Sequence, residues 1–160
     1  MRKYILGIAL LLLIASNVLG QETKTIQTRF GALAVNDAGL LLFKGAAVQP
    51  RIEAEDSLDL SEPYQIGASD VVLVTYTGGT ACPALYYFVT VTKSGAKLTP
   101  SFGTCSDLIK VKHMGDSISV AMPGYQGPLE SKRAQLRATR ERHVFIYHAG
   151  VVTENGKPVK

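Results

Sequence analysis

The two cysteines of this chain bracket the stretch with the strongest preference for β-structure, and this placement restricts the folds that the chain can adopt. Cys82 precedes an apolar run from Leu85 to Val91, and Cys105 follows the next turns. A Cys82–Cys105 disulfide would close a loop of about 24 residues and contribute roughly 3 kcal/mol to stability in the chain-entropy model. Redox-active pairs are spaced as C-x-x-C, so we expect a structural disulfide.

The segments around both cysteines look like those of small exported bacterial proteins. They are Gly78 to Tyr86, which reads GGTACPALY, and Phe102 to Asp107, which reads FGTCSD. The resemblance points to no named family and assigns no activity. Two cysteines in an exported chain usually pair, because the periplasm and the extracellular space are oxidising.

The beginning of the chain has the three parts of a secretory signal peptide, Met1 to Gly20. Two basic residues precede an apolar run of eleven residues, Ile5 to Ala15, and small residues follow. A membrane-spanning helix needs about 20 consecutive apolar residues, and Ser16 and Asn17 interrupt this run too early. We therefore expect cleavage before Gln21, no transmembrane segment afterwards, and a periplasmic or secreted product.

Removal of the signal peptide would leave residues 21–160, about 140 residues, which suits a single domain. The full chain carries a formal net charge of +4, and removing Arg2 and Lys3 lowers it to +2. A general nucleic-acid binder needs a stronger positive surplus. We expect the partner to be an envelope protein or an anionic envelope surface, and not nucleic acid.

Short apolar runs separated by turn signals predict a series of antiparallel strands. Val71 to Val74 is fully apolar and suits a central strand covered on both faces. In the run from Leu85 to Thr92, Tyr86 and Phe88 share one face, and we expect them to be buried. Further expected elements are a hairpin of 25–35 with 40–43, short strands at 48–52 and 64–66, a hairpin over 109–122 with its turn at Gly115-Asp116, a last strand at 144–147 and a frayed tail.

This pattern predicts a mainly β fold, an antiparallel β-sandwich or small β-barrel with one disulfide. The absence of crossover helices excludes a parallel α/β fold. The one segment of helical composition is Leu129 to Arg142, so we expect one short helix near the C-terminus. Only Leu129, Leu136 and Ala134 are candidates for its buried side.

The predicted helix contains the strongest local charge cluster of the chain. Arg133, Arg137 and Arg140 follow one another at spacings of four and three residues, which places them on one helix face. Such a face could bind anionic lipid, lipopolysaccharide or an acidic protein surface, although a solvated helix face is the commoner explanation. The candidate partner-binding residues are Lys132, Arg133, Arg137, Arg140 and Arg142.

No residue pattern identifies a catalytic or metal site, and we assign no cofactor. His143 and His148 lie five residues apart, so one strand points them to opposite faces. His113 is the third and last histidine. The nucleophile elbow G-x-S-x-G is absent. The five acids between Glu53 and Glu62 lack the glycine of a calcium loop, and we interpret this stretch as a solvated acidic loop.

Three functional hypotheses remain open. The first is a non-enzymatic binding or interaction module of the envelope, with the 129–142 segment as its contact. The second is an inhibitor or immunity protein of an envelope hydrolase, acting through a loop at 123–128 or 53–62. The third is a hydrolase with a site assembled from dispersed residues, in which His113 and His148 are the most plausible bases. It requires a pocket in which a histidine has an acid within reach.

Overall fold

The computed structural model describes residues 24–52 and 57–160. The expected signal peptide, Met1 to Gly20, lies outside these residues, and so do three acids of the acidic stretch, Glu53, Glu55 and Asp56. The described chain is mainly β-structure in three antiparallel sheets, with one short helix near the C-terminus and one disulfide. The fold class expected from the sequence is confirmed.

The first sheet is a meander of four strands in sequence order. They are β1 (Lys24–Thr28), β2 (Gly31–Val35), β3 (Leu41–Phe43) and β4 (Ala46–Ala47). The expected continuous strand over 25–35 was wrong, because Arg29 and Phe30 form a two-residue turn between β1 and β2. The strand expected at 48–52 is also absent: Pro50 has no amide hydrogen to donate to a neighbouring strand, and Val48 and Ile52 are buried individually.

The second sheet lies in the middle of the molecule and is built on two long strands. These are β7 (Ser69–Thr77) and β8 (Ala84–Thr92), which pair over eight residue pairs. Shorter strands extend the sheet on both sides: β5 (Ser57–Leu60) and β6 (Tyr64–Ile66) pair with β7, and β9 (Gly95–Leu98) and β10 (Phe102–Cys105) pair with β8. The acidic stretch is therefore not a loop throughout, because Leu58 packs into the core and draws the chain into β5.

The third sheet is a meander of five strands in sequence order: β11 (Lys110–Met114), β12 (Ser117–Met122), β13 (His143–His148), β14 (Val151–Glu154) and β15 (Lys157–Pro158). The hairpin expected over 109–122 is confirmed, with Gly115 at a positive φ of 62° in the two-residue turn. The tail does not fray. Asn155-Gly156 forms a tight turn, and the Val159 amide donates to the carbonyl of Val152 at 2.9 Å.

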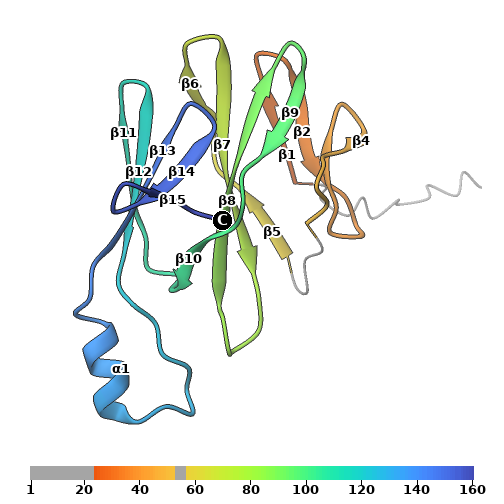
Figure 1. Ribbon diagram of the computed structural model, residues 1–160. Coiled ribbons are helices and arrows are strands. Elements are labelled where there is room, and N and C mark those ends of the chain that lie inside the picture. Colours follow the sequence, from red (N-terminus) through yellow and green to blue (C-terminus); the bar gives the residue numbers. More distant parts are fainter. Residues whose placement is uncertain (1–23, 53–56) are drawn as a thin grey trace, which may run out of the picture.

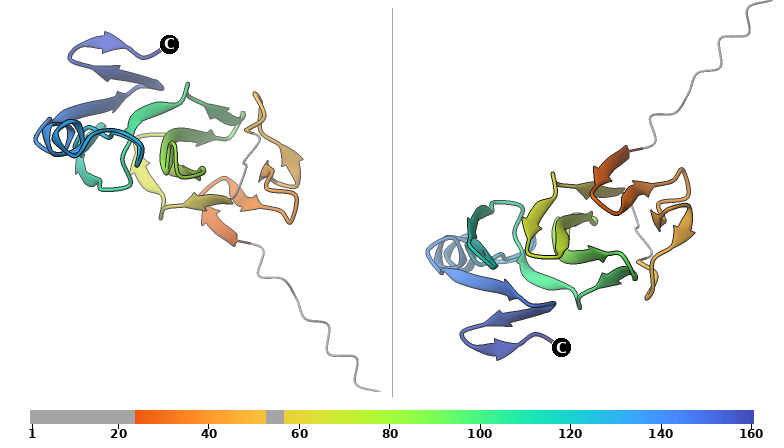
Figure 2. Two further views of the ribbon diagram at one scale, coloured as in Figure 1. Left: turned by 90° about the horizontal axis from the view of Figure 1, so that it is seen from below. Right: turned by 90° about the horizontal axis from the view of Figure 1, so that it is seen from above.

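The three sheets are stacked, with the second sheet between the other two (Figure 1, Figure 2). One core forms between the second and third sheets and contains the aromatic cluster of Tyr86, Phe88, Phe102, Phe145 and Tyr147. The other core forms between the first and second sheets around Leu33, Leu41, Val72, Val74, Val89 and Val91. Successive residues of β7 thus enter opposite cores, which confirms the doubly covered central strand.

A buried ion pair connects the first sheet to the middle one. Asp70 at the start of β7 is 1% exposed. Its carboxylate accepts hydrogen bonds from the backbone amide and Nε of Arg29, both at 2.6 Å. The same guanidinium donates to the carbonyls of Gly67 and Ser69. A buried carboxylate requires such complete pairing, so the β1–β2 turn is attached to the β6–β7 turn.

The helix α1 (Lys132–Ala138) connects β12 to β13 and lies beyond one end of the sheets (Figure 1). It begins at Ser131, whose hydroxyl accepts a hydrogen bond from the Ala134 amide at 3.2 Å, as an N-cap residue does. The helix is half as long as the expected segment. Leu129 and Leu136 are not buried, being 100% and 58% exposed, and Ala138 is the buried helix residue instead.

Candidate functional site

The exposed side of α1 gathers cations around an apolar side chain. Arg133, Arg137 and Arg140 line one hollow together with Leu136, and Lys132 is exposed beside them. We call Lys132, Arg133, Arg137 and Arg140 the basic tip. Within residues 24–52 and 57–160, none of these four side chains forms an ion pair or a hydrogen bond.

The fifth candidate from the sequence, Arg142, lies at a different place. It follows α1 and lines a groove on the outer side of the third sheet, together with Lys110 and Lys112 of β11. The structure thus separates the expected cluster into the basic tip and a second basic group. The two lysines were visible in the sequence as the outward-facing residues of the 109–122 hairpin, but nothing there related them to Arg142.

The order of the sheets turns a charge asymmetry of the sequence into a spatial one. Residues 107–160 contain nine Lys and Arg against five Asp and Glu, whereas residues 21–106 contain six against eight. The third sheet and α1 come entirely from residues 107–160, and the first two sheets come from residues 21–106. One outer layer of the molecule is therefore basic.

The described acids do not neutralise the basic tip. Of the acidic stretch, Asp59 pairs with Lys24 of β1, on the other side of the molecule from α1. Glu141, next to Arg140, faces His143 instead, with Oε2 3.4 Å from Nε2. Neither Asp59 nor Glu141 therefore pairs with the basic tip.

His143 is held between two carboxylates. Its Nδ1 lies 2.8 Å from Oε1 of Glu154, and its Nε2 faces Glu141. The hydrogen bond to Glu154 raises the pKa of His143 above its ordinary value, partial burial opposes this, and Glu141 adds to the increase. Lys157 lines the same open hollow. Both ring nitrogens are occupied by acids, so neither is directed at a hydroxyl nucleophile.

The other two histidines are exposed and engaged locally. Nε2 of His113 lies 2.9 Å from the Gly115 carbonyl, and its ring meets the edge of Tyr64. Nδ1 of His148 lies 3.5 Å from Asp116. The described residues contain no group of three or more His, Cys, Asp or Glu side chains placed so that it could hold a metal ion. The histidine with an acid at each ring nitrogen is thus His143, which the sequence did not single out.

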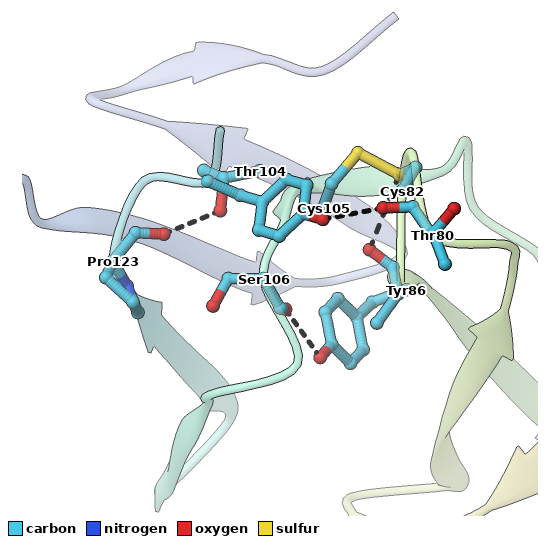
Figure 3. The surroundings of a disulfide bond; sticks show 9 residues. Thr80, Cys82, Tyr86, Thr104, Cys105, Ser106 and Pro123 are labelled. Atoms are coloured by element: carbon cyan, nitrogen blue, oxygen red, sulfur yellow. Dashed lines mark hydrogen bonds between the residues drawn. A yellow bond between two sulfur atoms is a disulfide. The ribbon is translucent and has the colours of Figure 1, made fainter. Parts of the chain in front are cut away.

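The disulfide joins the segment before β8 to the end of β10, as expected, and fastens the loops at one end of the middle sheet (Figure 3). The Tyr86 hydroxyl donates to the carbonyl of Ser106 at 2.9 Å. Burial and the nearby Asp107 raise the pKa of Tyr86 to about 12, so this hydroxyl keeps its proton. The Thr104 hydroxyl donates to the carbonyl of Pro123 at 2.6 Å. Together with the disulfide, these hydrogen bonds hold the neighbouring segments in place, so the role of this region is structural.

The 123–128 loop, a candidate inhibitory loop in the sequence, is also fastened. The Tyr125 hydroxyl donates to the carbonyl of Thr80 at 2.7 Å, and the side-chain amide of Gln135 donates to the carbonyl of Gly127 at 3.2 Å. Tyr86 and Phe88 are buried, as expected. Among these features, only the basic tip and the groove present unpaired charge next to exposed apolar surface.

Comparison with protein-family models, with curated proteins and with solved structures found no match. Among the described residues, α1 is far too short and too polar to cross a membrane.

Proposed function

We propose that this chain is an exported, non-enzymatic binding module of the cell envelope and that the basic tip is its contact surface. The observation that carries the proposal is the hollow in which Arg133, Arg137 and Arg140 surround exposed Leu136. Neither these three arginines nor the neighbouring Lys132 has a carboxylate partner among the described residues. Unpaired like charges next to exposed apolar area are typical of a surface that meets an anionic partner.

Some of the charges of α1 oppose the stability of the helix, although Arg137 in the last turn suits the negative end of the helix dipole. The first turn contains no acid and carries Lys132 and Arg133 instead, although the positive end of the helix dipole favours acids there. Arg133 and Arg137 are like charges four residues apart, which costs a few tenths of a kcal/mol. Residues that destabilise their own helix on an exposed surface are typical of functional sites. These charges therefore support a binding role for α1.

Two observations support export. The Cys82–Cys105 disulfide is formed, and disulfides persist in oxidising compartments. The residues at the beginning of the chain have the pattern of a signal peptide. These two observations support the proposal of a periplasmic or secreted location.

The hydrolase hypothesis has less support. It needs a histidine positioned toward a nucleophile, whereas His143 has a carboxylate at each ring nitrogen. Its favoured bases, His113 and His148, are exposed and engaged with the Gly115 carbonyl and with Asp116. We retain an inhibitor or immunity protein as a special case of the binding module, in which the partner is an envelope hydrolase.

A pull-down from envelope extract tests the proposal. The baits are the mature protein, the variant Arg133→Glu/Arg137→Glu/Arg140→Glu, and the control Lys93→Glu/Lys97→Glu/Lys160→Glu. The control changes the net charge equally at exposed residues away from α1. We expect a stoichiometric partner with the first and third baits and its loss with the second. Recovery of no partner, or equal recovery with all three baits, would overturn the proposal.

A further inference from the structure

A groove on the outer side of the third sheet has the composition of a peptide-binding site. It encloses about 740 Å³ and lies between the segment that precedes β11, the outer side of β11 and β12, and the connection from α1 to β13. Its apolar part consists of Leu108, Ile109, Ala121, Met122 and Pro123. Leu108 is 66% exposed, so a large apolar side chain stands at the edge of the groove without cover.

The polar part of the groove is positively charged. Lys110, Lys112 and Arg142 contribute three cations, and none of them forms an ion pair within the described part of the chain. The one carboxylate in the lining, Glu141, faces His143. An occupant of this groove thus meets three unpaired cations beside an apolar floor.

Shape distinguishes between the possible anionic occupants. Lys110 and Lys112 extend from an edge strand of the third sheet, while α1 projects beyond the end of that sheet (Figure 1). A flat membrane surface would meet the projecting basic tip first, whereas a groove with an apolar floor accepts a single inserted side chain. Acidic side chains on both sides of an apolar one complement the observed lining.

We propose that this groove binds a short acidic segment of a partner protein. A large apolar side chain of that segment packs against Leu108 and the groove floor, and its carboxylates pair with Lys110, Lys112 and Arg142. The inference rests on the proposed function and extends it, because it names the chemistry of the partner and adds residues outside α1. The groove and the basic tip then form one contact region, joined by the 139–142 connection.

Fluorescence anisotropy with three synthetic peptides tests the inference. One peptide alternates Glu and Leu, the second replaces Glu by Gln, and the third replaces Leu by Ser. We expect the first to bind at least about tenfold more tightly than the other two, because the groove requires both charge and apolar area. Equal binding of the first and third peptides would show a purely electrostatic attraction and would overturn the inference.

Matched variants locate the binding. Lys110→Glu/Lys112→Glu should weaken the Glu/Leu peptide about tenfold or more, and Leu108→Ser should weaken that peptide alone. Lys93→Glu/Lys97→Glu, with the same charge change on β8–β9, should leave binding unchanged. The inference would be overturned if Lys110→Glu/Lys112→Glu bound the peptide as well as the parent protein does, or if both double variants lost affinity equally. Binding of anionic lipid vesicles in place of the peptide would also overturn it.

The two proposals fail in different ways. In one outcome, peptide binding is independent of Lys110 and Lys112 while recovery of the partner still depends on Arg133, Arg137 and Arg140. In that case the groove inference is wrong and the proposed function stands. If no partner depends on these arginines, the proposed function is wrong, whatever the peptides do.

Discussion

At the scale of single residues, His143 shows how tertiary packing creates an interaction that the sequence does not announce. The sequence correctly places His143 and His148 on opposite faces of one strand. Glu154 reaches His143 because β14 folds back beside β13, with Phe145 opposite Glu154 in the register. An imidazolium donates from both ring nitrogens, so the charged form satisfies both carboxylates.

This arrangement predicts a pH dependence of stability. The pKa of His143 is raised in the folded state, so its contribution is fully present below the unfolded pKa of about 6.5 and is lost as the pH rises through the folded pKa. We expect His143→Gln to lower the urea midpoint more at about pH 6 than at about pH 8.5. Comparison of the variant with the parent protein at each pH removes the contributions that the two proteins share. Equal losses at both pH values would contradict the prediction.

At the scale of elements, α1 shows why composition overestimates the length of a helix. The segment 129–142 has helical composition throughout, but ordered helix covers only Lys132–Ala138. The end is set by packing: Ala138 is buried, and the amides of Arg140 and Glu141 bond to the carbonyls of Arg137 and Ala138 in tight turns. The chain then turns into β13. No periodicity in the sequence marks this position.

Gly124 occupies the place where this helix end packs, and its replacement should be costly. A Cβ at Gly124 would lie 2.6 Å from Oε2 of Glu141 and 3.0 Å from the carbonyl oxygen of Ala138. The glutamate can move, but the backbone cannot move without shifting α1. We expect Gly124→Ala to lower the free energy of unfolding by about 1–3 kcal/mol, measured by urea denaturation.

Gly127 provides the matched control for this prediction. A Cβ at Gly127 meets no atom within 4 Å. Gly127→Ala should therefore leave stability unchanged or raise it by up to about 1 kcal/mol, because alanine reduces the freedom of the unfolded chain. If the two alanine variants were equally stable, the packing explanation would be incorrect.

At the scale of the whole molecule, three sheets follow one another along the chain and lie in the same order in space (Figure 2). The middle sheet supplies apolar side chains to two cores. The disulfide lies within this middle sheet and closes the β8–β9–β10 unit. Any loosening of that unit would affect both layers that pack on it.

Reduction of the disulfide should therefore destabilise the molecule as a whole. Loss of the Cys82–Cys105 bond should cost roughly 3 kcal/mol, since the unfolded chain regains the freedom of a loop of about 24 residues. We expect reductant to lower the melting temperature of a protein that consists of residues 21–160. The double variant Cys82→Ser/Cys105→Ser should melt at a similarly low temperature with and without reductant. Identical melting of the parent protein in both conditions, with free thiols detected, would refute this expectation.

The sequence by itself determined the features that depend on neighbouring residues. Period-two alternation and a β-branched run predicted the strands around Val71 to Val74 and Leu85 to Val91, and turn residues predicted the Gly115-Asp116 hairpin. The presence of only two cysteines, behind a predicted signal peptide and without C-x-x-C spacing, predicted their disulfide. These signals are local, because backbone geometry and side-chain direction repeat over two to four residues.

Tertiary structure alone decided the features that join distant segments. It paired Arg29 with Asp70, gave β5 a place in the middle sheet, fastened the tail through Val159, and left Leu136 exposed. It also divided the basic cluster and placed Arg142 beside Lys110 and Lys112. Such contacts depend on which sheet faces which, and this choice is made by burial of apolar area over the whole chain, which no local pattern records.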